Sequence, residues 1–154
     1  MNPEDQRERP GSVLDEMICF ALYSAHHAMN RVYQPLLAGL GLTYPQYLVM
    51  RLLWEKNDRT VRELADLILL ESNTLTPLLK RLEATGLVER ARDAEDERKV
   101  RITLTPTGRR LENKARKVPC EISAASGRSD PDFRKLYRRI QSLRESLRDD
   151  AAGA

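Results

Sequence analysis

Residues 60–105 carry most of the information about the fold of this chain, and they read TVRELADLILLESNTLTPLLKRLEATGLVERARDAEDERKVRITLT. The block opens with Thr60 and, three residues later, Glu63, which is the spacing of a capping box at the start of a helix. The apolar residues that follow recur at helical spacing: Val61, Leu64, Ala65 and Ile68. We therefore predict a helix from Thr60 to about Leu70.

A second helix is predicted after a short turn. Its apolar face consists of four leucines spaced i, i+3, i+4 and i+7: Leu75, Leu78, Leu79 and Leu82. Proline fits without loss only in the first turn of a helix, so Pro77 places the N-cap at Asn73 or Thr74. Gly86 suits the C′ position, which predicts a helix end near Ala84.

A charged β-hairpin is predicted to follow this helix. Residues 87–92 are typical of a strand, and residues 100–105 alternate apolar and polar side chains with period two. The loop between them, residues 93–99, is highly charged. Two capped helices joined by a short turn and followed by a hairpin are the layout of a winged helix-turn-helix.

Two further helices are predicted before this block. Ser12–Asp15 has the spacing of a capping motif, and apolar residues then recur in steps of three and four over about seven turns. Gly39 and Gly41 are expected to end that helix. Thr43–Gln46 is another capping box, which predicts a helix that runs to about Glu55.

Two helices are also predicted after the block. Thr105, followed by a proline, is expected to cap a helix that runs to about Ala125. Residues 127–129 break the chain, and Asp130 is expected to cap a last helix that runs to about Asp149. The predicted fold class is therefore mainly α with a small β-hairpin wing.

The order of these elements predicts the domain organisation. Residues 1–11 are polar and end in Pro10-Gly11, so we expect a flexible tail. Residues 43–105 are expected to form the winged helix-turn-helix domain. The flanking helices, residues 12–40 and 107–150, could then serve as an assembly platform.

Composition excludes several classes of protein. Apolar residues make up 41% and charged residues 32%, the net charge is +3, and no apolar run approaches the ~20 residues of a membrane span. The acidic N-terminus lacks the pattern of a signal peptide, so we expect a cytoplasmic protein with no membrane partner. His26 and His27 have no further ligands at suitable spacing, so neither a metal nor a cofactor is expected.

The second helix of the block carries the candidate DNA contacts. Its leucines would anchor one face to the core and turn the other face outward, exposing Asn73, Thr74, Thr76, Pro77, Lys80 and Arg81. Small polar groups near a helix N-terminus can approach base edges in the major groove. Lys80 and Arg81 can neutralise phosphates or bind guanine. These residues are therefore predicted to contact DNA.

The hairpin loop carries a second set of candidate contacts. Arg98 can reach a minor groove, where narrow segments concentrate negative potential. Asp96, two residues earlier, could hold the guanidinium in place. DNA should repel the other acids of this loop, and the sequence does not explain Asp93, Glu95 and Glu97.

Cys19 is a candidate redox thiol. It lies in the first helix with Tyr23 on the same face, whereas Tyr33 is about 21 Å further along that helix. Tyr33 could therefore meet Cys19 only across a dimer, and Tyr44 opens the next helix. A thiolate that accepts hydrogen bonds from two tyrosine hydroxyls would have a lowered pKa and could attack a peroxide.

Five motifs resemble the MarR family of dimeric winged-helix transcription regulators. They are TVRELAD at 60–66, TLTPLLKRLE at 74–83, GLV at 86–88, DER at 96–98 and LTPTG at 104–108. The resemblance spans roughly residues 12–149. It implies a homodimer in which the N- and C-terminal helices interlock and two recognition helices bind a palindromic operator on double-stranded DNA.

The spacing of Cys19, Tyr33 and Tyr44 resembles the OhrR branch of this family, which senses organic hydroperoxides. The resemblance implies a reduced dimer that represses a peroxide-detoxifying gene, with Tyr33 and Tyr44 supplied by the other subunit. Peroxide would oxidise Cys19 to a sulfenic acid, which condenses with a second thiol and releases the operator.

Cys120 is the candidate resolving thiol. Two-cysteine OhrR-like proteins carry such a cysteine in the corresponding helix, about one turn later, where this chain has Ala124. One turn keeps the same helix face, so a bond between Cys19 and Cys120 of the two subunits is a reasonable expectation. Otherwise a small external thiol would have to resolve the sulfenic acid.

Two alternatives to a redox-controlled repressor remain open. A MarR-type repressor could be released by a small phenol or aromatic acid in a pocket lined by the tyrosines, with Cys19 incidental. A thiol peroxidase would instead turn over peroxide at Cys19. The winged helix-turn-helix block argues against an enzyme.

Overall fold

The structure is a computed structural model that describes residues 12–125 and 130–152. Its contacts divide the chain into two units, Met1–Val118 and Pro119–Ala154, which are described separately here. The predicted tail at residues 1–11 and the predicted break at 127–129 lie outside the described residues.

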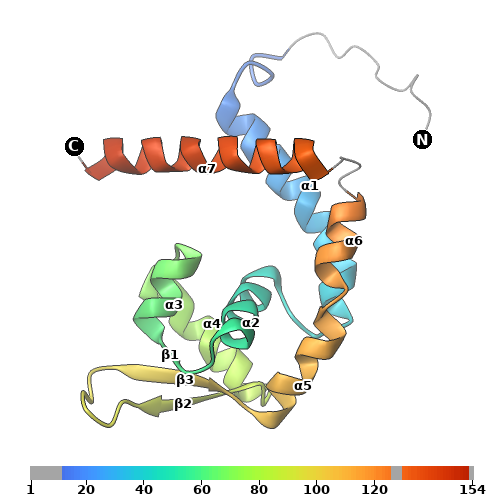
Figure 1. Ribbon diagram of the computed structural model, residues 1–154. Helices are drawn as coiled ribbons and strands as arrows, with labels where there is room; N and C mark the ends of the chain where they lie inside the picture. The colour runs from blue at the N-terminus through green and yellow to red at the C-terminus, as the bar shows by residue number, and fades with distance from the viewer. Residues whose placement is uncertain (1–11, 126–129, 153–154) are drawn as a thin grey trace. The chain divides into compact units, whose positions relative to one another are not determined.

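The first unit holds five helices and three strands among its described residues. In chain order they are α1 (Ile18–Ala38), α2 (Tyr44–Glu55), β1 (Arg59–Thr60), α3 (Val61–Ile68), α4 (Ser72–Ala84), β2 (Val88–Arg92), β3 (Val100–Leu104) and α5 (Pro106–Ala115). Figure 1 shows α2, α3 and α4 gathered on one side of the hairpin formed by β2 and β3. The predicted winged helix-turn-helix fold is confirmed.

Three threonines begin helices as predicted. Thr43 and Thr60 each close a capping box, with Gln46 and Glu63 as the reciprocal partners. The Thr105 hydroxyl accepts a hydrogen bond from the Gly108 N–H at 3.0 Å. Each cap satisfies backbone donors that have no partner inside their helix.

Glycines end α1 and α4 in the same way. Gly41 and Gly86 have φ values of +68° and +70°, a region that side chains with a Cβ rarely adopt. The next residue in each case, Leu42 or Leu87, donates its N–H back to the carbonyl five positions earlier. Both glycines therefore occupy the C′ position of a Schellman motif.

Two predicted helix starts are wrong. Ser12–Asp15 forms an isolated turn, in which the Asp15 N–H bonds the Ser12 carbonyl, and α1 begins later, at Ile18. Helix α4 begins at Ser72, with Glu71 as its N-cap. The Glu71 carbonyl accepts hydrogen bonds from two backbone N–H groups, so a full turn forms before Pro77.

The predicted helix from Thr105 to Ala125 is two helices. Helix α5 ends at Ala115, and α6 runs from Val118 to Ala125. Pro119 explains the break, because a proline has no N–H to donate to the preceding turn and fits only near a helix start. It occupies the second position of α6.

The predicted hairpin is confirmed, and a third strand extends it. The strands lie in the order β1-β3-β2, and all pairs are antiparallel. Arg90 of β2 and Arg59 of β1 both pair with Ile102 of β3. Strand β1 is only two residues long, so it carries no alternating pattern that sequence could show.

The core of the first unit lies between the helices and the inner face of the sheet. Its fully buried side chains come mainly from α2, α4 and the hairpin: Val49, Met50, Leu53, Leu75, Leu79, Leu82, Val88 and Ile102. The predicted leucine face of α4 is confirmed, since all four leucines are buried.

The second unit holds most of α6 and the 23-residue helix α7 (Asp130–Ala152). The helix begins at Asp130, where the sequence predicts it, and extends three residues beyond the predicted end. The large apolar side chains of α7 that are exposed in the single chain are Leu136, Tyr137, Ile140 and Leu147.

Gly108 lies at a junction that has no room for a side chain. A Cβ at this position would overlap the Leu87 carbonyl oxygen, and the Gly108 carbonyl accepts a hydrogen bond from Trp54 Nε1 at 2.9 Å. The junction therefore joins α2, the start of β2 and α5 through backbone groups that cannot move independently.

Gly108→Ala should lower the free energy of unfolding by about 1–3 kcal/mol, because the new methyl group forces the backbone apart. Urea denaturation measures this. Gly39→Ala is the matched control, because Gly39 is helical with φ −63° and its Cβ would lie an ordinary 3.5 Å from the Leu36 carbonyl oxygen. Equal stability of the two variants would contradict the close approach at Gly108.

Candidate functional site

The outward face of α4 presents the side chains predicted to contact DNA. Asn73, Thr74, Pro77, Lys80 and Arg81 are exposed. Thr76 is half-buried, and its hydroxyl donates to the Ser72 carbonyl at 2.8 Å. The structure therefore places five of the six predicted residues where a DNA groove could reach them, while the hydroxyl of the sixth bonds its own helix.

Asp93, one of the three loop acids that the sequence left unexplained, has a structural role. The Asp93 carboxylate accepts hydrogen bonds from the backbone N–H groups of Glu95 and Asp96, and from Arg101 Nη1 at 3.0 Å. These bonds, chiefly the one from Glu95, lower the pKa of Asp93. The carboxylate thus organises the loop.

Asp96 holds Arg98 as predicted. Its carboxylate accepts hydrogen bonds from the Arg98 backbone N–H at 3.1 Å and from Arg98 Nε at 3.2 Å, and these bonds lower the pKa of Asp96. The Arg98 side chain is 92% exposed. The contact orients a solvated guanidinium at the tip of the wing, and such an exposed ion pair adds little to stability.

Arg101 ties the wing to the loop before β1. Its guanidinium bonds the Asp58 carboxylate at 2.6 Å, the Asp58 carbonyl at 3.1 Å and Asp93 at 3.0 Å. The two carboxylates raise the pKa of Arg101. Asp58 has a φ of +65°, an uncommon conformation that this network holds.

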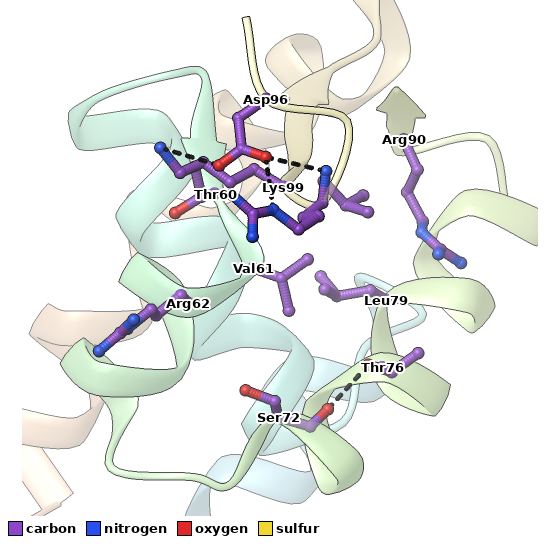
Figure 2. A pocket seen from close by; sticks show the side chains of 11 residues that line it. Thr60, Val61, Arg62, Ser72, Thr76, Leu79, Arg90, Asp96 and Lys99 are labelled. Atoms are coloured by element: carbon purple, nitrogen blue, oxygen red, sulfur yellow. Dashed lines mark hydrogen bonds and ion pairs between the residues drawn. The ribbon is translucent and has the colours of Figure 1, made fainter. Parts of the chain in front are cut away.

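A groove of about 500 Å³ lies between α4, the start of α3 and the wing. Figure 2 shows Val61 and Leu79 facing each other across it, with Arg62 on one side and Arg90 on the other. Sequence reasoning missed Arg62, Arg90 and Lys99 in this groove. The alternation of β2 could have shown Arg90, because Arg90 shares the inner face of the strand with buried Val88.

Tyr33 and Tyr44 come together within one chain. Their ring centroids are 4.8 Å apart, and Tyr47 lies 6.2 Å from Tyr33. The two tyrosines line a second cavity of about 730 Å³ between α1, α2 and the end of α3, together with His26 and Arg31. Partial burial, helped by Tyr44 and Tyr47, raises the pKa of Tyr33 to about 12.

Cys19 lies apart from this cluster within the first unit. Cys19 is exposed near the start of α1, about 21 Å along the helix from Tyr33, and Cys120 is exposed in α6. The structure therefore pairs Tyr33 with Tyr44 but does not bring Cys19 to Tyr33 within one chain.

Residues 12–125 and 130–152 contain no helix long and apolar enough to cross a membrane. Over the same ranges, no cluster of three or more histidine, cysteine or acidic side chains could hold a metal ion.

Comparison with known proteins identifies the fold. A family model described as transcriptional regulator SarA/Rot matches residues 31–115. The HTH-type transcriptional regulator TtmR of Methylorubrum extorquens is 48% identical over 141 residues, which cover 92% of this chain and 72% of that protein. The organic hydroperoxide resistance transcriptional regulator of Bacillus subtilis is 43% identical, over 87% of this chain and 91% of that one.

A solved structure of reduced AbfR bound to DNA matches with a TM-score of 0.78 and 33% identity, over 88% of this chain and 93% of that one. AbfR is a Staphylococcus epidermidis protein, and its overoxidized DNA-bound and disulfide forms also match.

The fold is thus that of a winged-helix protein, and a protein with a similar fold has been solved in complex with DNA. The chain belongs to the MarR/SarA family of winged-helix transcriptional regulators. The resemblance to the hydroperoxide-sensing branch is confirmed as a similarity of sequence over most of both chains.

The raised pKa of Tyr33 predicts a loss of stability at high pH. The folded state binds the phenolic proton more tightly than the unfolded state, so this contribution is complete below pH 10 and falls as the pH rises toward about 12. Tyr33→Phe should lose less stability over that range. The difference in tyrosinate absorbance between wild type and variant should have its midpoint near pH 12. A midpoint near pH 10 in the folded protein, as expected in guanidinium, would show instead that this hydroxyl is fully solvated.

Proposed function

We propose that this chain is a homodimeric repressor that releases a palindromic operator when an organic hydroperoxide oxidises Cys19. The observation that carries the proposal is the separation of the thiol from the paired tyrosines. Tyr33 and Tyr44 lie 4.8 Å apart, while Cys19 is exposed about 21 Å along the helix that also carries Tyr33. A second copy of the chain could bring its Cys19 to this pair.

Exposed apolar side chains support a dimer. In the segment before and at the start of α1 they are Val13, Leu14, Met17, Ile18, Leu22 and Tyr23, and α7 adds four more. Such apolar surface on a small protein favours an interaction with another chain. The predicted dimerisation segments, residues 12–40 and 107–150, contain all of these side chains.

The proposed chemistry begins at the Cys19 thiolate. Its sulfur attacks the terminal oxygen of the hydroperoxide, the O–O bond breaks, and the alkoxide leaves and takes up a proton to become an alcohol. The sulfur is oxidised by two electrons to a sulfenic acid. A second thiol, from Cys120 of the partner or a small external molecule, then forms a disulfide and releases water.

Known relatives support this assignment. The Bacillus subtilis relative is named for organic hydroperoxide resistance, and AbfR has been solved reduced on DNA, overoxidized and with a disulfide formed. For this chain we propose the same class of signal. Tyr33 and Tyr44 would donate hydrogen bonds to the thiolate, and disulfide formation would break them.

A small phenol or aromatic acid is the alternative effector. The cavity of about 730 Å³ beside Tyr33 and Tyr44 has a volume in the range of ligand sites, and Arg31 lines it. An effector of this kind would act without Cys19.

Cys19→Ser should separate the two effectors. In a DNA mobility assay on the intergenic sequence beside its own gene, cumene hydroperoxide should release the wild type and leave Cys19→Ser bound. A serine hydroxyl cannot form the sulfenic acid. Equal release of both proteins would contradict the proposal, and release of Cys19→Ser by a phenolic acid would favour the alternative.

Cys120→Ser should show which thiol resolves the oxidised Cys19. On a non-reducing gel, peroxide should convert the wild type to a disulfide-linked dimer, and both Cys19→Ser and Cys120→Ser should remain monomers. The release of DNA by Cys120→Ser should then depend on an added small thiol. A covalent dimer in Cys120→Ser would show that Cys120 is not the resolving thiol.

A further inference from the structure

The groove between α4 and the wing lies where a DNA backbone strand would be expected to pass. It is lined by Ser72, Thr76 and Leu79 of α4 on one side and by Arg90 and residues 96–100 of the wing on the other. If α4 enters a major groove and the wing tip enters the adjacent minor groove, one sugar–phosphate strand separates them. That strand must cross this groove.

The charge of the groove suits a phosphate. Four cationic side chains line it: Arg62, Arg90, Arg98 and Lys99. The one acid in the lining is Asp96, whose carboxylate already lies 3.2 Å from Arg98 Nε and 3.6 Å from Lys99 Nζ. Arg62 and Arg90, on opposite sides, make no contact with this acid in the described structure and could bind an anion.

The Arg90 guanidinium has an N–H group without a hydrogen-bond acceptor in the part of the chain that the structure describes. Its Nε is buried and has no hydrogen-bond acceptor among the described residues. Its Nη1 lies 3.7 Å from the Glu83 carboxylate, which is beyond hydrogen-bond distance. The Arg90 side chain also lines the groove, so its Nη groups, rather than the buried Nε, could donate hydrogen bonds to a phosphate oxygen there.

The floor of the groove suits the sugar. Val61 and Val100 line it with partly exposed apolar side chains, and Thr60 and Ser72 also line it. A deoxyribose presents C–H groups to such a floor while its phosphates face the basic rim. This division matches the alternating chemistry of a DNA backbone.

We propose that this groove binds one phosphodiester group of the DNA backbone, with Arg90 and Arg62 as the phosphate-binding side chains. The inference rests on the proposed function, because it assumes that α4 and the wing enter adjacent DNA grooves. These two residues position the protein on the duplex and do not read its sequence, unlike the outward face of α4.

The test is the salt dependence of binding to a random-sequence duplex, measured by fluorescence anisotropy in a series of potassium chloride concentrations. Each lost phosphate contact reduces the slope of log K against log salt by about 0.9, so a dimer of Arg90→Gln should lose about 1.8. At moderate salt we expect roughly tenfold weaker binding, equal for random and intergenic duplexes.

Two further variants control for charge and folding. Arg109→Gln removes the same charge from an exposed position on α5 outside the groove, and its slope should match the wild type. Glu83→Gln removes the carboxylate nearest Arg90 and should tighten binding to both duplexes, which a misfolded protein could not do.

Each outcome decides one of the two proposals. A wild-type protein that binds neither duplex at any salt concentration overturns the proposed function itself. If the wild type binds but Arg90→Gln and Arg109→Gln have equal slopes, the phosphate site is wrong and the proposed function stands. A loss in Arg90→Gln confined to the intergenic duplex would also overturn it, because Arg90 would then be reading bases.

Discussion

Burial of one face of α4 is the interaction on which the candidate DNA-binding surface depends. Leu75, Leu79 and Leu82 have no exposed surface, and each such side chain contributes about 1.5–3 kcal/mol when taken out of water. Because these leucines fix the rotation of the helix about its axis, the opposite face must carry Asn73 and Lys80 outward. The position of the candidate DNA contacts therefore follows from packing on the far side of the same helix.

Ion pairs and hydrogen bonds hold the wing in place, whereas apolar packing holds α4. Arg101 bonds Asp58 and Asp93, and Asp93 in turn accepts hydrogen bonds from the loop backbone. Two acids of a loop expected to approach DNA, Asp93 and Asp96, thus accept hydrogen bonds from the protein's own donors. This leaves the basic side chains of the loop and of the neighbouring groove to dominate the electrostatics there.

The proposed redox site is subject to a different constraint. A single helix carries both Cys19 and Tyr33, and its rise of ~1.5 Å per residue keeps them apart whatever their side chains do. A contact between Cys19 and Tyr33 therefore requires a second chain. This constraint would make the dimer part of the sensor, and it would couple oxidation of one subunit to the helices of the other.

Local signals in the sequence were sufficient to predict most of the helices and strands. The caps at Thr43, Thr60 and Thr105 and the C′ glycines depend on hydrogen bonds within five residues, so their spacing alone predicts them. The pairing of Tyr33 with Tyr44, the strand β1 and the contacts of Arg101 with Asp58 depended on the tertiary fold, because residues up to 43 positions apart must first be brought together. The tertiary fold also decided where α4 begins. The sequence shows that Pro77 cannot donate a backbone hydrogen bond, which favours a later start. It does not show that Leu75 is buried, and this burial favours a helix that already includes the residues before Pro77.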